Sequence, residues 1–132
     1  MIVVDENLHD QRILSAIAAW YSGQVISVTA LRPRSVIKDE AIPTLLRQAV
    51  QPTFVTINAE DFWRRIEPHR RYCIINIALP KERALETPLL LQRLFRLSEF
   101  KTKAARMGKV VRITPTRVDY YGSDRRVRSL PL

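Results

Sequence analysis

The feature that most constrains the fold is a regular alternation of short apolar, β-branched runs with segments of helical character. The runs lie at residues 2–4, 25–28, 53–56 and 73–77. Runs of this length without polar alternation are typical of strands that are covered on both faces. The alternation therefore predicts an α/β fold with a central, mainly parallel sheet and right-handed crossovers.

Helices are expected between these strands. The first has Asn7 as its cap and Gly23 as its stop, and its apolar residues recur at helical spacing, at Ile13, Leu14, Ile17 and Tyr21. The second is expected to begin near Asp39 and to end before Pro52, with an apolar stripe of Ile42, Leu45, Leu46 and Ala49. A short third helix is expected over residues 60–65.

The last part of the chain, residues 81–132, is expected to hold a long helix and terminal strands. Thr87 and Pro88 predict the start of this helix, because threonine caps helices and proline suits the first helical position. The helix is expected to continue to about Met107. Residues 110–121 predict a hairpin or a pair of edge strands.

The length of 132 residues suits one domain that spans residues 1–132. No apolar segment approaches the ~20 residues of a membrane span, so no membrane partner is expected. Cys73 is the single cysteine and cannot form an internal disulfide, and the chain opens without the basic region of a secretory signal. A cytoplasmic location is therefore expected.

The charge is strongly positive and unevenly distributed. The chain has 22 Lys and Arg against 13 Asp and Glu, a formal net charge of +9. Residues 1–62 carry 5 basic and 7 acidic side chains, whereas residues 63–132 carry 17 and 6. A surplus of this size predicts a polyanionic partner, most often nucleic acid, and ordinary surface charge is the alternative explanation.

Acidic and polar side chains follow the predicted strands. They are Asp5 and Glu6 after the first strand, Asp39 and Glu40 before the second helix, and Thr56, Asn58 and Asp61 at the end of the third strand. Ligands of open α/β sheets bind beyond the carboxyl ends of the strands, so these groups are expected to converge. Converging carboxylates repel one another unless a cation neutralises them, which predicts Mg²⁺ or Mn²⁺. Taken singly, Asp39 and Asp61 could instead cap helices, and Glu6 could be solvated.

Three stretches of the sequence together resemble the PIN-like nuclease family. They are Val3-Val4-Asp5-Glu6-Asn7-Leu8, Asp39-Glu40-Ala41-Ile42 and Val55-Thr56-Ile57-Asn58-Ala59-Glu60-Asp61-Phe62. The first looks like the opening of small bacterial PIN-like proteins, and the third is similar to a stretch of VapC-type toxins. The resemblance covers roughly residues 1–80.

The resemblance implies a PIN-like three-layer sandwich and a metal-dependent ribonuclease. Asp5, Asp39 or Glu40, and Asp61 match the catalytic, metal-binding acids, and Glu6 matches the second acid of the opening motif. Thr56 and Asn58 match the polar residues that hold the loop after the third strand. We expect Asp5, Asp39 and Asp61 to bind the metal, with Glu6, Glu40 and Asn58 as indirect or substitute ligands. One form of this function is the toxin of a toxin–antitoxin pair, with an antitoxin protein as partner. Asn58 stands where many relatives have aspartate, so the alternative is a catalytically degraded PIN-like module that binds RNA or another protein.

The basic half supplies candidate contacts to RNA. They are Arg64, Arg65, Arg70, Arg71, Lys101 and Lys103. The aromatic residues among these charges could stack on bases or could belong to the core: Trp63, Tyr72, Tyr120 and Tyr121. The apolar stripe from Leu89 to Phe95 could form a homodimer or antitoxin-binding surface, or could pack in the core.

Overall fold

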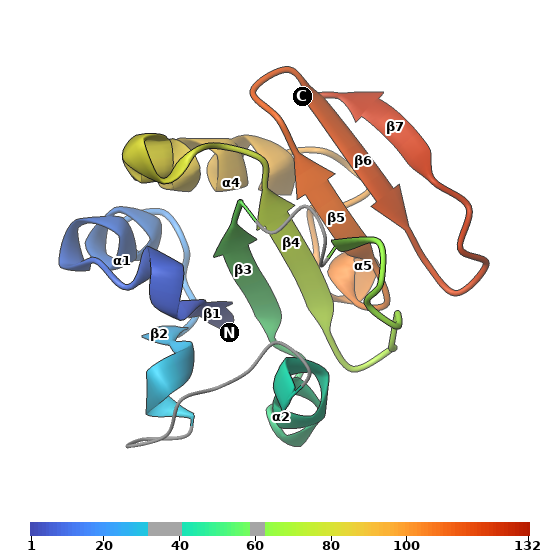
Figure 1. Ribbon diagram of the computed structural model, residues 1–132, viewed down its shortest axis with the longest axis horizontal. Coiled ribbons are helices and arrows are strands. Elements are labelled where there is room, and N and C mark those ends of the chain that lie inside the picture. The colour runs from blue at the N-terminus through green and yellow to red at the C-terminus, as the bar shows by residue number, and fades with distance from the viewer. Residues whose placement is uncertain (32–40, 59–62) are drawn as a thin grey trace.

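The computed structural model describes residues 1–31, 41–58 and 63–132, and within them the strands form one seven-stranded sheet (Figure 1). The order across the sheet is β2-β1-β3-β4-β5-β6-β7. The strands are β1 Ile2–Val4, β2 Val25–Ser27, β3 Thr53–Ile57, β4 Cys73–Ile77, β5 Val110–Ile113, β6 Arg117–Tyr121 and β7 Arg128–Pro131.

The first five strands are parallel and the last two run in alternating directions. β1 pairs in parallel with β2 and β3, β3 with β4, and β4 with β5, whereas β5–β6 and β6–β7 are antiparallel. The predicted α/β fold with a mainly parallel sheet is therefore confirmed. Because β2 and β3 lie on opposite sides of β1, the strand order reverses between β1 and β3. In open α/β sheets this reversal creates a crevice at the carboxyl ends of the two strands.

Helices cover both faces of the sheet. They are η1 Glu6–Leu8, α1 Gln11–Ala18, η2 Val28–Ala30, α2 Ile42–Gln48, η4 Lys81–Glu86, α4 Thr87–Phe95 and α5 Lys103–Arg106. α1 and α4 pack on one face, and α2 packs on the other (Figure 1). No helix in the described part of the chain is long and apolar enough to cross a membrane.

Each face of the sheet has its own apolar core. In β1, Ile2 and Val4 belong to the cluster beneath α1 and α4, and Val3 belongs to the cluster beneath α2. Successive side chains of a strand point to opposite faces, so a strand covered on both sides is buried at every position. β3 and β4 are buried throughout in the same way. This is the physical reason that their sequences are mainly apolar and do not alternate regularly with polar residues.

The cap predicted for the first helix is wrong. Asp10, rather than Asn7, caps α1, because the Asp10 side chain accepts a hydrogen bond from the backbone N–H of Arg12. Residues Glu6–Leu8 form a separate 3-10 turn that Asp5 caps. The extra turn places the Asn7 side chain against β3 instead of at a helix terminus.

The single long helix predicted after Thr87 is also wrong. It is divided into α4 and α5, which are joined by residues 96–102. Phe100 in this connection is fully buried, and Arg106 donates hydrogen bonds to the carbonyl oxygens of Phe100 (2.9 Å) and Lys101 (3.3 Å). These contacts hold the connection in a turn. Thr87 is the first residue inside α4 and does not cap it.

The hairpin predicted over residues 110–121 is confirmed as β5 and β6. The sequence did not predict β7, which forms the edge of the sheet. Three of its four residues are exposed, so it lacks the buried apolar run by which the other strands are recognised.

Candidate active site

The carboxyl ends of β1 and β3 bring Asp5 and Thr56 together. The backbone N–H of Asp5 donates to the carbonyl oxygen of Val55 (2.8 Å), which extends the β1–β3 ladder by one residue. Oδ2 of Asp5 accepts a hydrogen bond from Oγ1 of Thr56 (2.7 Å), and Oδ1 accepts one from the N–H of Glu6 (2.7 Å). The carboxylate is therefore fixed in orientation at the switch point of the sheet.

Asn7 closes this network from the adjoining turn. Its Nδ2 donates to Oγ1 of Thr56 (3.2 Å) and to the carbonyl oxygen of Ile57 (3.0 Å). The Thr56 side chain is only 1% exposed, so its hydroxyl group needs these partners. The loop after β1 and the end of β3 are thus held together by side-chain hydrogen bonds as well as by the ladder.

Asn58 lies just beyond the end of β3. Its backbone has a φ of 55°, in the left-handed region that asparagine tolerates better than most residues. Its N–H donates to the carbonyl oxygen of Ile77 (2.9 Å), and the residue is exposed. The turn therefore presents a polar residue at the same edge of the sheet as Asp5.

The polar character of this edge continues across the sheet. The registers align Thr56 with Asn76, Asn76 with Arg112, Arg112 with Asp119, and Asp119 with Ser129. Side chains that are aligned across strands point to the same face. The row lies two residues beyond Val3, Phe54, Ile74, Val110 and Tyr121, which form the apolar core on that face. We call these residues the polar row: Thr56, Asn76, Arg112, Asp119 and Ser129.

Asp119 joins the last three strands of the polar row. Its carboxylate contacts the guanidinium groups of Arg112 (3.5 Å) and Arg117 (3.1 Å) and accepts a hydrogen bond from Oγ of Ser129 (2.6 Å). Asp119 is 7% exposed, so the ion pairs compensate for the burial of its charge. Arg112 is thereby held beside the buried Asn76.

The sequence reasoning did not find Asn76, Arg112, Asp119 or Ser129 as members of a site. One signal was present, because Asn76 interrupts an apolar strand and a buried amide requires hydrogen-bond partners. Asp119 interrupts the run from Val118 to Tyr121 in the same way. The alignment of these residues depends on strand order, which the periodicity does not give.

The remaining predicted ligands lie outside the described residues. They are Asp39, Glu40 and Asp61. Among the described residues there is no group of three or more His, Cys, Asp or Glu side chains able to hold a metal ion. Asp5 and Asn58 carry side-chain oxygens at one edge, and oxygen is the donor that Mg²⁺ and Mn²⁺ prefer. The donor chemistry of the described part therefore fits such an ion.

Two other acidic residues near Asp5 have different surroundings. Glu6 is exposed in η1. Asp10 forms an ion pair with Arg12 (2.8 Å), and this hydrogen-bonded guanidinium lowers the pKa of the Asp10 carboxyl. A pocket of about 330 Å³ lies between η1 and η4, and both acids line it. Asp10 therefore acts as a helix cap that is already neutralised.

The predicted RNA-binding residues do not gather around Asp5. Lys101 and Lys103 line a pocket with Met1, at the amino end of β1. Met1 and Asp5 are four residues apart along this strand, about 13 Å at ~3.3 Å per residue. Arg64 lies over the ring of Tyr121 (5.5 Å), which is aligned with the first residue of β5. These three cations therefore lie toward the amino ends of the parallel strands.

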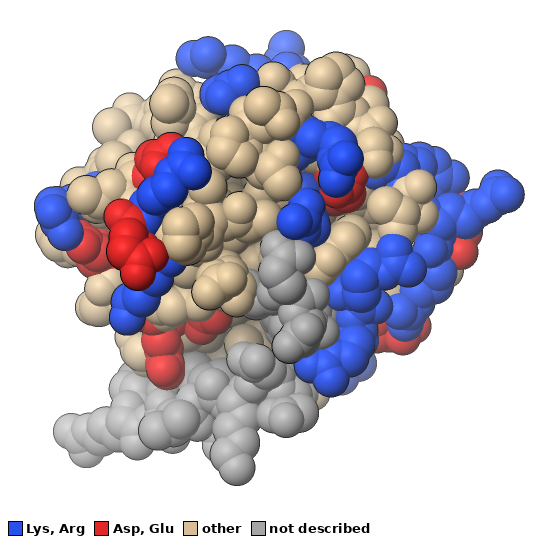
Figure 2. Space-filling view, turned by 45° about the horizontal axis from the view of Figure 1, so that its top comes forward, with Lys and Arg blue, Asp and Glu red and all other residues tan. Residues whose placement is uncertain are grey.

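Other basic residues flank the outer strands. Arg65 is exposed beside Arg64, and Arg70 and Arg71 are exposed just before β4. Figure 2 shows Lys and Arg gathered on the side of β6 and β7, where Arg125, Arg126 and Arg128 follow one another closely in the chain. On the opposite side of the same view, over α1 and η4, basic and acidic residues alternate.

The aromatic residues proposed for base stacking belong mainly to the core. Trp63, Tyr72 and Tyr121 are at most 8% exposed. The hydroxyl group of Tyr121 donates to the carbonyl oxygens of Trp63 (2.5 Å) and Ile66 (2.8 Å), and burial raises the pKa of Tyr121 to about 12. Tyr120 is half-buried and packs edge-on against Phe100 at 5.2 Å. Three of the four rings are therefore unavailable for stacking.

The apolar stripe from Leu89 to Phe95 is also mainly core. Leu90, Leu91 and Leu94 are buried, whereas Leu89 is 59% exposed and Leu85, in η4, is 53% exposed.

Comparison with known proteins adds no assignment, because no protein-family model, no curated protein and no solved structure matches this chain. The fold and the site together define an α/β protein that has an aspartate at the point where the strand order of its sheet reverses.

Proposed function

We propose that this protein is a metal-dependent ribonuclease of the PIN-like type, with its active site at the carboxyl ends of β1 and β3. The observation that carries the proposal is the Asp5–Thr56–Asn7 network. It orients an aspartate at the place where open α/β sheets bind ligands. The sequence resemblance adds Asp39, Glu40 and Asp61 as candidates for the rest of the ligand set.

In this proposal Asp5 is a direct metal ligand. Its Oδ1 accepts a hydrogen bond from the N–H of Glu6 and its Oδ2 accepts one from Oγ1 of Thr56, and an ionised carboxylate with an orientation fixed in this way is a ligand that hard divalent cations prefer. Thr56 and Asn7 are positioning residues, since they touch the carboxylate or its hydrogen-bonding partner. When bound, Mg²⁺ or Mn²⁺ would polarise a phosphodiester and lower the pKa of a bound water molecule.

RNA is the proposed substrate because the chain combines this acidic edge with a large basic surplus. Arg112, whose guanidinium group is fixed by Asp119, is a candidate contact for a substrate phosphate. The exposed Arg65, Arg70 and Arg71 would add affinity that falls with salt concentration. An antitoxin protein and a second copy of the chain stay predictions of the sequence, for which the exposed Leu85 and Leu89 are candidate contacts.

The second candidate function is an RNA-binding module of the same fold without cleavage. The observation that favours it is Asn58, which presents an amide rather than a carboxylate at the end of β3. The distance of Lys101 and Lys103 from Asp5 also favours binding that does not depend on this edge.

The proposal is tested by cleavage of a mixed RNA pool with Mg²⁺ or Mn²⁺. Asp5→Asn keeps the size and shape of the side chain and removes its negative charge, so we expect the rate of cleavage to fall about 100-fold or more. Asp124→Asn, in the turn between β6 and β7, is the matched control and should leave cleavage unchanged. Metal-dependent cleavage that survives in Asp5→Asn contradicts the site. RNA binding that is sensitive to salt but not to EDTA, with no cleavage by the unaltered protein, supports the second function.

A further inference from the structure

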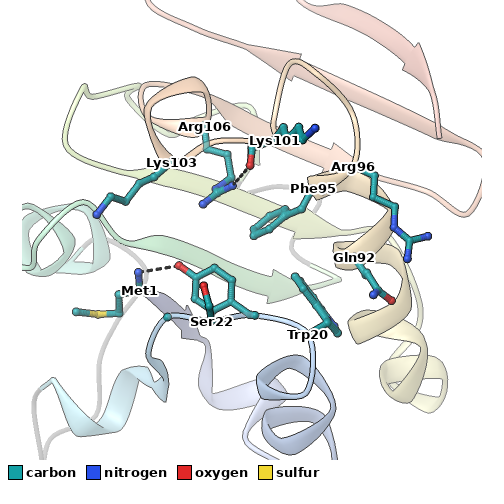
Figure 3. A pocket seen from close by; sticks show the side chains of 11 residues that line it. Met1, Trp20, Ser22, Gln92, Phe95, Arg96, Lys101, Lys103 and Arg106 are labelled. Carbon is teal, nitrogen blue, oxygen red and sulfur yellow. Dashed lines mark hydrogen bonds between the residues drawn. The ribbon is translucent and has the colours of Figure 1, made fainter.

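A second pocket lies at the other end of β1 from Asp5. It has a volume of about 540 Å³, within the range of small-molecule sites. Figure 3 shows that its walls come from the loop after α1, the last turn of α4 and the segment that leads into α5. Nothing in the proposed ribonuclease site uses this pocket.

The pocket is cationic. Arg96, Lys101, Lys103 and Arg106 line it, and none of its lining residues is acidic. The described residues contain no carboxylate paired with any of these four side chains. Uncompensated positive charge around a concave surface raises the local concentration of anions. The ligand that fits this surface therefore carries negative charge.

Arg106 is the innermost of these cations. It is 5% exposed and is held by the carbonyl oxygens of Phe100 and Lys101 and by the ring of Phe95, 4.1 Å from its guanidinium carbon. Its Nε has no hydrogen-bond partner among the described residues. Burial lowers the pKa of its guanidinium group. A buried cation without a carboxylate is costly, and a bound anion would supply the missing counter-charge.

Aromatic rings form another part of the wall, next to Arg106. Trp20, Tyr21 and Phe95 pack edge to face, with centroids 5.5 to 6.1 Å apart, and each of these residues is half-buried. Figure 3 shows the Trp20 and Phe95 rings in this wall. The indole N–H of Trp20 has no partner among the described residues. Gly23 lies under the Tyr21 ring so closely that an added Cβ would be 2.7 Å from a ring carbon. The wall therefore offers planar apolar surface.

From these observations we infer that the pocket binds a nucleotide, with the phosphate group on Lys103 and Arg106 and the base against the aromatic wall. Phosphate oxygens match the fork of donors on arginine, and nucleobases stack on aromatic side chains whatever their sequence. The nucleotide can be a free mononucleotide or the 5′-phosphorylated end of an RNA strand, which share this chemistry. The inference does not depend on cleavage at Asp5.

The test is a titration with adenosine 5′-monophosphate, followed by tryptophan fluorescence in a Trp63→Phe background. Trp20 is then the remaining tryptophan, and we expect a saturable change in its emission. Adenosine, which lacks the phosphate, and inorganic phosphate, which lacks the base, should each bind at least about tenfold more weakly.

Charge-reversal variants distinguish binding in the pocket from general electrostatic attraction of an anionic ligand to a basic protein. Lys103→Glu should weaken binding of the nucleotide about tenfold. Lys103 begins α5, where glutamate is favoured by the helix dipole, so this variant should fold. Arg126→Glu, in the turn between β6 and β7, is the matched control and should change the affinity less than about twofold.

Two oligoribonucleotides of equal length, one with a 5′-phosphate and one with a 5′-hydroxyl, distinguish the sources of the nucleotide. Saturation by the mononucleotide supports a free ligand, and saturation by the 5′-phosphorylated strand alone supports the end of an RNA. The inference is overturned if no probe saturates the signal, if inorganic phosphate binds as tightly as the nucleotide, or if Arg126→Glu weakens binding as much as Lys103→Glu. Loss of cleavage in Asp5→Asn would leave all these results unchanged.

Discussion

Oγ1 of Thr56 donates a 2.7 Å hydrogen bond to Oδ2 of Asp5, although the two residues are 51 positions apart in the chain. Parallel pairing of β1 with β3 makes this contact, because it aligns the residue after Val4 with the residue after Val55. The contact links the fold to the proposed chemistry, since the buried Thr56 fixes the orientation of the Asp5 carboxylate.

Thr56→Val should show whether Thr56 orients the Asp5 carboxylate or only packs in the core. The variant keeps the β-branched shape but loses the donor to Asp5 and the acceptor for Asn7, so we expect about tenfold weaker Mn²⁺ binding. Thr56→Ser restores the hydroxyl group and should bind Mn²⁺ within about threefold of the unaltered protein, although it loses a buried methyl group that contributes about 1 kcal/mol. Isothermal titration with Mn²⁺ measures both affinities. Equal affinities in the valine and serine variants would refute the positioning role.

Asp119→Asn should destabilise the protein through the polar row. It removes the partner of Arg112 and Arg117 at a residue that is 7% exposed, so we expect unfolding in urea to require about 2 kcal/mol less. Asp124→Asn breaks the exposed pair with Arg128 and should change the stability much less, because solvent screens exposed ion pairs. A loss for Asp119→Asn no larger than that for its control would show that the row does not support the fold.

Tyr121 should make stability decline at high pH. Burial raises its pKa from 10.0 to about 12 in the folded protein, so the unfolded chain loses the phenolic proton first. The contribution of Tyr121 to stability is therefore complete below pH 10 and declines as the pH rises toward 12. Tyr121→Phe leaves the carbonyl oxygens of Trp63 and Ile66 without this donor and should cost about 1 to 3 kcal/mol at neutral pH. Urea midpoints across this pH range should decline less in the variant; an equal decline would contradict the assignment.

Cys73 should be unreactive while the protein is folded. The thiol is fully buried, and burial raises its pKa to about 12. Only the thiolate attacks disulfide reagents, so labelling at pH 8 should follow the rate of unfolding. Reaction with an aromatic disulfide reagent, with and without denaturing urea, measures this. Rapid modification of one thiol per chain in the absence of urea would show that Cys73 is accessible.

The sequence was sufficient for the parts of the fold that depend on local pattern. The strands β1, β3 and β4 were predicted because burial on both faces leaves a mainly apolar run. β2, at the edge of the sheet, was predicted from its β-branched residues. The break between α4 and α5 was not predicted from the sequence, because it depends on tertiary contacts of Arg106 with residues 100 and 101. A local pattern of good helix formers does not reveal such a contact.

The candidate site was predictable in part for the same reason. Asp5 was identified from its place after a strand, and the structure pairs it with Thr56. The polar row was not identified, because Asn76, Arg112 and Asp119 come together only through pairing of distant strands. The cationic pocket likewise joins Trp20 with Lys101 and Arg106, which are more than 80 positions apart in the chain.

The most direct test of the proposed ribonuclease is anomalous scattering from a crystal soaked in Mn²⁺. The proposal predicts an anomalous peak at ligand distance, about 2 to 2.5 Å, from a carboxylate oxygen of Asp5. The same soak of Asp5→Asn should give no peak there. An Mn²⁺ peak only at other places in the unaltered protein, with no density at Asp5, would contradict the proposal.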